Sequence, residues 1–472
     1  MNTFFRLGAV AAATFILAGC ASVNFDQAVQ DTNGSAGAFT QGKLELSRSD
    51  QQQQARSKLS SELLNKPLSQ DEAVQLALAN SPAVQTLLAQ SWADLATANQ
   101  TGRIANPVFT FERIRFADEL ELGRLLSFGL LDLLTLPRRM EISRSQTALA
   151  KVQLSATVVE QVTQVRQAWV RAVTARQTLQ YAEQINATAQ AGAELAKRMQ
   201  QVGNFTKLQR ARQQSFYADS AARLASSQHA STAAREELVR ILGLTDEQSA
   251  QLQLPERLPE LPKASRPADS VNATALQQRL DVQMARNQLD VAGKAQGLNL
   301  LNSLVDVELG IRRDTVFDNS SGTSTPKRGF ELGIRLPIFD WGSAQRDNMN
   351  AQSLAAANRY ESTVRGASSQ LRESYSAYRT AYDVAKHYRD EIVPLRKTMA
   401  EENLLRYNGM LIGVFELLAD TRDQISSVQA AINAYQQFWL ADAALSASMT
   451  GKPTAMGAMS LAGGGAAAEA GH

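Results

Sequence analysis

The stretch that decides the fold runs from Gly329 to Asp347 and reads GFELGIRLPIFDWGSAQRD. Its apolar side chains recur at every second position, whereas Glu331 and Arg335 belong to the opposite side of an extended chain. Period-two alternation predicts a β-strand that lies between an oily and a wet environment. The apolar residues concerned are Phe330, Leu332, Ile334, Leu336 and Ile338.

Three more stretches alternate in the same way: Val108 to Phe116, Leu120 to Phe128 and Val305 to Ile311. The candidate strands reach about 10 residues in length, which matches a tilted β-strand crossing the hydrocarbon layer. A soluble sandwich would have to bury the charged side chains, whereas a transmembrane barrel places them in a watery lumen. Four strands cannot close such a barrel, so several copies must share one. The predicted lumen-facing residues are Asp306, Glu308, Arg312, Glu331 and Arg335.

The rest of the chain predicts helices arranged as a tandem repeat. Ser69 and Glu72 form a candidate capping box for a helix that runs to about Gly102, and a matching helix spans about 271–302. Runs without clustered breakers at about 139–201 and 343–407 predict helices of about 95 Å each. Shorter helices at about 69–102 and 206–242 can stack end to end along a long one. A coiled-coil-like apolar seam in the second long run contains Pro394, where we expect a kink rather than an end.

The resulting fold class is mainly α with a small transmembrane β part and an internal tandem repeat. The predicted segments are a signal peptide (1–19), a lipidated and loosely ordered lead (20–66), a first repeat (67–245, hairpin 106–138), a linker (246–270), a second repeat (271–450, hairpin 303–341) and a disordered or equatorial tail (451–472).

Composition excludes several classes of protein. A formal charge of +2 gives no pull toward nucleic acid, and the single cysteine excludes an intrachain disulfide framework. The histidines are scattered, so we expect no metal site, and no cofactor is indicated. Without a phosphate loop, paired catalytic carboxylates or a histidine beside a nucleophile, we expect no enzymatic activity.

The first residues resemble a bacterial lipoprotein signal. A short basic segment precedes about 11 apolar residues and then Leu17-Ala18-Gly19-Cys20, too short for a membrane anchor that persists in the mature chain. This pattern resembles a lipobox, in which Cys20 would be acylated, for example with palmitate, and become the first mature residue. An ordinary secretory signal with a chance cysteine is the alternative. By the same resemblance, Ala21 after the cysteine favours the outer membrane.

Several motifs together resemble the outer membrane factor (TolC-like) family of efflux channels, from about Leu68 to Gly451. They are LPIFDWG at 336–342, QVGNFTKLQRARQQ at 201–214, LVRILGL at 238–244, RLDVQMARNQL at 279–289 and RYNGMLIGVFELLADTRDQ at 406–424. The resemblance implies a homotrimer with a twelve-stranded β-barrel and a long α-helical coiled-coil barrel through the periplasm. It also implies an exit duct for drugs, metal ions or other small solutes. Its partners would be a periplasmic adaptor and an inner-membrane pump, of the resistance-nodulation-division type.

Two features of this sequence bear on that resemblance. Where the second half has LPIFDWG, the first has FGLLDLLTLPRRMEI at 128–142, without a matching glycine. It is either a variant hairpin end packed on a neighbouring subunit or a surface facing lipid or substrate. Family members carry two acids at a constriction. Glu416 matches one, Ala419 occupies the place of the other, and Asp420 is displaced by one position.

The resemblance also places two helix reversals at an adaptor-binding tip. They are Val202-Gly203-Asn204 and Asn408-Gly409-Met410, where glycine would let the backbone turn back. A ring of Glu416 and Asp420 would attract cations and repel anions, and the second hairpin would open like an iris when partners bind. Alternatively these acids are ordinary solvated charges, with Arg422 as a neighbour. The competing function is a lipid-anchored periplasmic coiled-coil scaffold or adhesin without channel activity.

Overall fold

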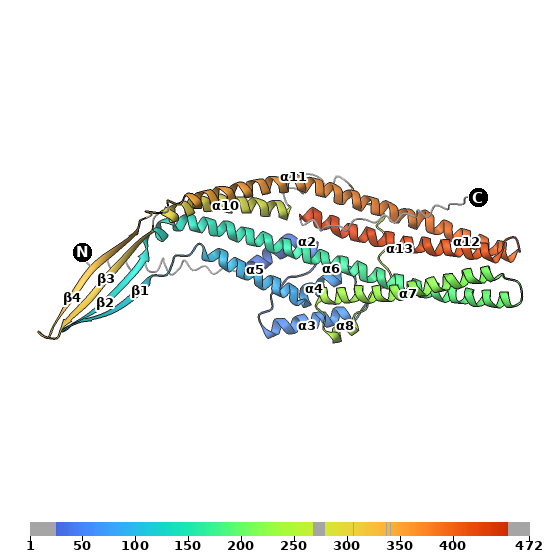
Figure 1. The fold of residues 1–472 in the computed structure, drawn as a ribbon, viewed down its shortest axis with the longest axis horizontal. Coiled ribbons are helices and arrows are strands. Elements are labelled where there is room, and N and C mark those ends of the chain that lie inside the picture. The colour runs from blue at the N-terminus through green and yellow to red at the C-terminus, as the bar shows by residue number, and fades with distance from the viewer. Residues whose placement is uncertain (1–24, 268–278, 305, 337, 340, 452–472) are drawn as a thin grey trace. The chain divides into compact units, whose positions relative to one another are not determined.

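In both halves of the chain, two β-strands follow a helical segment and precede a long helical run and a shorter helix (Figure 1). The computed structural model describes residues 25–267, 279–304, 306–336, 338–339 and 341–451. The first half contains α4 (Gln70–Asn80), α5 (Pro82–Gln100), β1 (Val108–Phe116), β2 (Glu119–Gly129), α6 (Leu130–Gln201), α7 (Lys207–Leu242) and α8 (Asp246–Gln251). The second contains α10 (Leu280–Leu304), β3 (Asp306–Asp318), β4 (Thr323–Arg335), α11 (Ser343–His387), α12 (Val393–Asn408) and α13 (Val414–Thr450).

Two compact units make up the chain. One comprises Met1–Thr32, Ala89–Leu154 and Gln283–Thr363 and contains the β-sheet. The other comprises Asn33–Leu88, Ser155–Val282 and Val364–His472 and contains the helical reversals. The predicted mainly helical fold with four β-strands is confirmed.

The four strands form one antiparallel sheet in the order β1-β2-β3-β4. The strand bounds differ from the predicted ones in the second half. β3 continues seven residues past Ile311 to Asp318, and β4 begins at Thr323 and ends at Arg335. Leu336 and Ile338 therefore follow the strand, and the predicted first residue Val305 lies outside the described part of the chain.

Most of the described part of the lead segment is helical, so its predicted loose order was wrong. It contains α2 (Phe25–Thr40) and α3 (Asp50–Leu64). The apolar residues of α2 lie on one side of the helix and are buried at Phe25, Ala28, Val29 and Ala36. The prediction overlooked them because the composition of the segment is mostly polar. In α3, Ser49 and Gln52 form a capping box that satisfies the first free backbone N–H groups.

The predicted helix from Ser69 to Gly102 is broken in two. Its start is as expected, since the Ser69 hydroxyl accepts from the backbone N–H of Glu72 and the Glu72 carboxylate accepts from that of Ser69. Hydrogen bonds from Lys66 and Ser69 lower the pKa of this carboxyl to about 2. Ser81 is extended (ψ 123°) before Pro82, because proline excludes the helical conformation from the residue that precedes it.

The first long helix begins nine residues earlier than predicted. α6 starts at Leu130, directly after β2 and with no loop, so the divergent stretch 128–142 comprises the end of β2 and the start of α6. Pro137 lies inside α6 although it cannot donate a backbone hydrogen bond to the carbonyl of Leu133. In the second half, the first nine residues of the helix predicted at 271–302 are not helical or lie outside the described part, and α10 begins at Leu280.

The second long helical run continues past Pro394, as predicted, and contains a π-helical turn just before this proline. A π-helical turn at Tyr388–Ile392 joins α11 to α12, and Pro394 lies near the start of α12. Proline leaves the carbonyl four residues earlier without its usual partner, and a π turn is one way for a helix to absorb such a defect. In the described residues, no helix combines the length and apolarity needed to cross a membrane.

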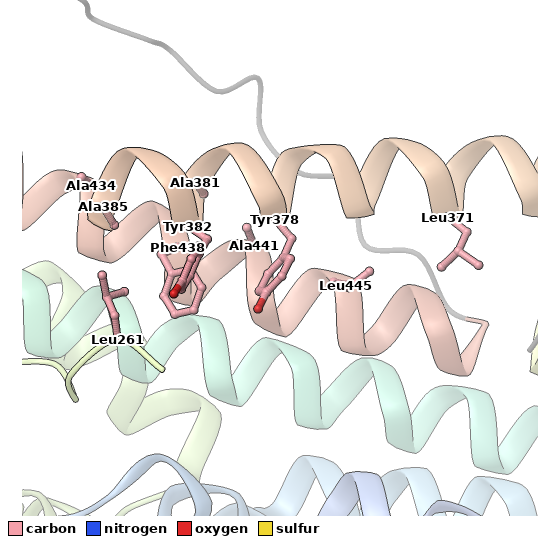
Figure 2. Close-up of a cluster of buried hydrophobic side chains, with 10 residues drawn as sticks. All are labelled: Leu261, Leu371, Tyr378, Ala381, Tyr382, Ala385, Ala434, Phe438, Ala441 and Leu445. Carbon is pink, nitrogen blue, oxygen red and sulfur yellow. The ribbon is translucent and has the colours of Figure 1, made fainter. Parts of the chain in front are cut away.

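We call the second compact unit, which contains the helical reversals, the helical unit. It is held together by a cluster of aromatic and small residues between α11 and α13 (Figure 2). Phe438 of α13 lies between Tyr378 and Tyr382 of α11, with ring centroids 5.6 and 5.8 Å away. The middle of the predicted seam is therefore buried, whereas Leu395 and Met399 near its end are exposed. The cluster comprises Leu261, Leu371, Tyr378, Ala381, Tyr382, Ala385, Ala434, Phe438, Ala441 and Leu445.

The tyrosines of this cluster also fix the linker between the repeats. The Tyr382 hydroxyl donates to the carbonyls of Pro262 and Lys263 at 3.1 and 3.2 Å. Tyr375 donates to the carbonyl of Arg266, and the Tyr378 hydroxyl accepts from the Arg266 N–H. A segment without regular structure thus obtains partners for its backbone groups from side chains of a helix.

The two helix reversals use different residues for their left-handed conformation. Gly203 has φ +85° after α6, as predicted from its lack of a Cβ. After α12, Gly409 has an ordinary φ of −79°, and Met410 has φ +61°. The prediction that Gly409 permits the second turn was therefore wrong. The side chains of Val202 and Met410 are exposed at the two reversals.

The packing predicts an order of destabilisation. Phe438→Ala removes a fully buried ring and should cost about 3–5 kcal/mol, whereas Tyr382→Phe loses only its hydrogen bonds and should cost about 1 kcal/mol. Leu395→Ala, at an exposed position, serves as the control. Thermal unfolding followed by circular dichroism should give the lowest midpoint for Phe438→Ala, a higher one for Tyr382→Phe and the highest for Leu395→Ala. A larger drop in midpoint for Leu395→Ala than for Phe438→Ala would contradict the assignment of Phe438 to the core of this unit.

The reversals predict a second contrast. Gly203→Ala forces a Cβ into the left-handed region and should destabilise the first turn by about 1–2 kcal/mol. Gly409→Ala, the matched control, keeps an allowed φ and should change little. Hydrogen exchange at the amides of 203–205 and 409–411 measures this locally. Exchange should accelerate about fivefold or more in the first variant only, and equal acceleration in both would be inconsistent with the observed backbone.

Candidate functional site

The sheet has two chemically different faces because its register never slips. Every pair from Val108↔Ser127 to Phe116↔Glu119, and every pair from Asp306↔Arg335 to Asp318↔Thr323, keeps one offset. Directly opposed residues share a face, so each face is one parity class of each strand. One face consists of the odd-numbered residues of β1 and β3 and the even-numbered residues of β2 and β4, and we call it the apolar face. The remaining residues form the charged face.

The apolar face exposes large hydrophobic side chains in the half of the sheet that joins the helices. Phe330 is 81% exposed, and Ile311, opposite it, is 59% exposed. Contiguous exposed apolar surface of this kind marks a face that contacts something other than water. Its apolar members in this half are Phe109, Leu126, Phe128, Val307, Leu309, Ile311, Phe330, Leu332 and Ile334.

The charged face carries a network centred on Arg312. Its guanidinium lies 3.1 Å from the Glu112 carboxylate, 2.8 Å from that of Asp314 and 4.0 Å from that of Glu331. Lys327 lies 3.8 Å from Glu121 on the same face. Except for Arg312–Asp314, which lies within β3, these pairs join residues of different strands. Their polar atoms need a polar environment on this side of the sheet.

The structure brings most of the predicted lumen-facing residues to this one face. Glu308, Arg312, Glu331 and Arg335 share its parity, and Asp306 takes the matching backbone position at the start of β3, although its side chain lies outside the description. Sequence reasoning missed Glu112 and Asp314. The same alternation extended past residue 312 would have found Asp314.

Strand β1 changes its pattern halfway along. Phe109 and Phe111 lie on the apolar face, but Ile114 and Phe116 lie on the charged face. The residues that replace them on the apolar face are Arg113 and Arg115. The alternation predicted for 108–116 therefore holds for its first half only.

The predicted constriction acids lie one helical turn apart near the start of α13. Glu416 is exposed, whereas Asp420 is buried and its Oδ2 has no hydrogen-bond partner among the described residues. In the described part of the chain, Arg422 forms no ion pair with Glu416 or Asp420. Its guanidinium donates to the Gln213 side chain at 3.4 Å and lies 4.3 Å from the centre of the Phe216 ring, both on α7. Arg422 therefore ties the two hairpins of the helical unit together.

Two other predictions concern lipid and metal. Cys20 lies outside the described residues. Within the described ranges, no three His, Cys, Asp or Glu side chains are grouped so that they could hold a metal ion.

Comparison with known proteins finds similarity in one family and one fold. Residues 271–451 match the outer membrane efflux protein family. No curated protein sequence is matched significantly. The solved outer membrane protein VceC of Vibrio cholerae is similar, with a TM-score of 0.66 and 16% identity over 81% of this chain and 96% of that chain.

Two further channel structures show the same likeness. The CmeC outer membrane channel of Campylobacter jejuni gives a TM-score of 0.65 and 15% identity, over 84% of this chain and 86% of that chain. The open state of the MtrE outer membrane channel of Neisseria gonorrhoeae gives 0.63 and 19%, over 81% and 88%. At these identities the likeness establishes the fold. Residues 271–451 therefore match the outer membrane efflux protein family, and the chain has the fold of these solved outer membrane channels.

Proposed function

We propose that this protein is the outer membrane exit duct of a tripartite efflux system, and that it passively conducts small solutes from the periplasm to the exterior. The observation that carries the proposal is the sheet with one exposed apolar face and one charge-paired face. Lipid against the apolar face and water against the charged face would give each face a solvent that suits its side chains. A scaffold that worked only as a coiled coil would have no use for this sheet.

The edges of the sheet support assembly from several copies. Among the residues that the structure describes, β1 and β4 each pair with a strand on one side only. Unpaired backbone groups are not tolerated in hydrocarbon, so β4 of one copy would pair with β1 of the next. Three copies of four strands would close the twelve-stranded barrel that the family resemblance implies, with Glu308, Arg312, Glu331 and Arg335 in its lumen.

The helical unit supplies the parts that such a duct needs in the periplasm. The exposed reversals, Val202-Gly203-Asn204 and Asn408-Gly409-Met410, would contact the adaptor. Glu416 and Asp420 would lie at the constriction, and the Arg422 link between hairpins would have to change as the second hairpin opens. Acylation of Cys20 would add a lipid anchor. The pump, which we expect to be of the resistance-nodulation-division type, would select the exported drug, metal ion or other solute.

The proposal predicts opposite accessibility for two adjacent strand residues. In protein reconstituted into liposomes, Glu331→Cys should react with a membrane-impermeant maleimide and Phe330→Cys should not, because the first faces the lumen and the second faces lipid. Wild-type protein, whose single cysteine is Cys20, gives the background labelling. Conductance in planar bilayers and a heat-modifiable trimer on gels are expected as well. Equal labelling of both cysteines without conductance would support the scaffold instead.

The constriction predicts an effect on ion selectivity. Glu416→Ala should lower the preference for cations over anions, because the carboxylates converging at one aperture attract cations. Glu236→Gln, which removes an exposed acid of α7, is the control. Reversal potentials in a salt gradient across a planar bilayer measure the preference. An unchanged cation preference in the Glu416 variant would remove this residue from the constriction while leaving the channel proposal intact.

A further inference from the structure

Five arginines share the apolar face of the sheet, and no acidic residue does. They are Arg113, Arg115, Arg124, Arg313 and Arg328. Strands β1 and β2 contribute three of them and strands β3 and β4 one each, from the middle of the sheet to its hairpin turns. Arg124 is half-buried and the others are exposed. We call this set the arginine belt.

Three members of the belt lie side by side across the sheet. Arg313 is paired directly with Arg328, and the flanking pairs Leu122↔Thr315 and Leu125↔Arg312 place Arg124 beside Arg313. Neighbouring strands are about 4.8 Å apart. Like charges in directly opposed positions repel and destabilise a sheet unless an anion compensates them.

The cations of the two faces differ in their partners. On the charged face, Arg312 and Lys327 have carboxylates within 4.0 Å. On the apolar face, none of the belt arginines has an ion-pair or hydrogen-bond partner among the residues that the structure describes. The belt is therefore a set of guanidinium groups whose charge no residue in the described part of the chain neutralises.

Apolar surface borders the belt on the same face. Ile311 and Phe330 precede the Arg313–Arg328 pair by one step toward the helices, and Leu120 and Phe317 lie among the arginines toward the turns. A ligand that fits this order has an anionic head joined to hydrocarbon. Arginine on a lipid-facing strand is costly at the bilayer centre but nearly free at the interface, so the belt should lie at headgroup depth.

We propose that the arginine belt binds the phosphate groups of anionic phospholipids, whose acyl chains cover the adjoining apolar half of the sheet. The planar guanidinium offers paired N–H donors that match phosphate oxygens. This inference rests on the proposed membrane function, and it adds a specific lipid class. It also fixes the turn end of the sheet at a membrane surface that carries anionic lipid.

Matched variants separate this site from the general charge of the protein. Arg313→Gln with Arg328→Gln removes two belt arginines. Arg312→Gln with Lys327→Gln removes two cations from the neighbouring positions on the opposite face. Full-length protein in detergent is mixed with phosphatidylglycerol or with phosphatidylcholine of the same acyl chains, and retained lipids are counted by native mass spectrometry. Sodium phosphate at a fixed concentration is added in a third arm.

Wild-type protein and the Arg312/Lys327 variant should retain phosphatidylglycerol in preference to phosphatidylcholine. The Arg313/Arg328 variant should lose that preference by about tenfold or more, from about fivefold per arginine near a charged lipid surface. Free phosphate should not displace the lipid, because it lacks the acyl chains. Displacement by phosphate, or equal loss of preference in both double variants, would overturn the inference.

Failure of the inference and failure of the proposed function look different in this experiment. If wild-type protein retains both lipids equally, the headgroup site is disproved and the membrane-embedded sheet stands. If it retains neither lipid, and Phe330→Cys is labelled as readily as Glu331→Cys in liposomes, the membrane function itself is disproved and the inference with it.

Discussion

The rest of the sheet depends on a register that holds without a slip along each strand pair. Because side chains alternate, a one-residue slip of β3 would exchange its two faces, and Arg312 would leave Glu112 and Glu331, on other strands, for the apolar side. The ion pairs across strands and the apolar pairs behind them therefore favour the same alignment. That agreement lets a sheet of four strands present two surfaces that suit different solvents.

In the helical unit, one row of side chains both packs two helices and binds the linker backbone. Alanines at 381, 385, 434 and 441 let α11 and α13 approach closely, and Phe438 fills the space between two tyrosines. Tyr375, Tyr378 and Tyr382 are apolar toward the cluster, and each uses its hydroxyl for the linker backbone. One row of residues thus packs two helices and also fixes the irregular segment between the repeats. Side chains of this row differ in size from turn to turn, which makes one helix alignment preferable.

Local sequence signals succeeded where a local physical cause was sufficient. The Ser69 and Glu72 capping box, the left-handed Gly203 and the strand alternation of 306–312 depend on neighbours in the chain. Errors arose where packing decided. The polar lead folded into α2 and α3 because a few apolar residues found a core, and α6 passed through Pro137. Met410, rather than Gly409, took the strained conformation, since the surrounding helices set the path of the chain.

The sequence alone determined the class of the fold, the repeat and the alternation of apolar and charged residues in the strands. It also determined four of the residues that share the charged face. These features depend on periodicity, which is a property of the order of residues in the chain. Tertiary structure decided which charges meet. Glu112 and Arg312 are 200 residues apart and contact only because β2 lies between their strands in a fixed register. The arginine belt emerged in the same way, since its members come from all four strands. Proximity across strands depends on register and strand order, which no local pattern contains.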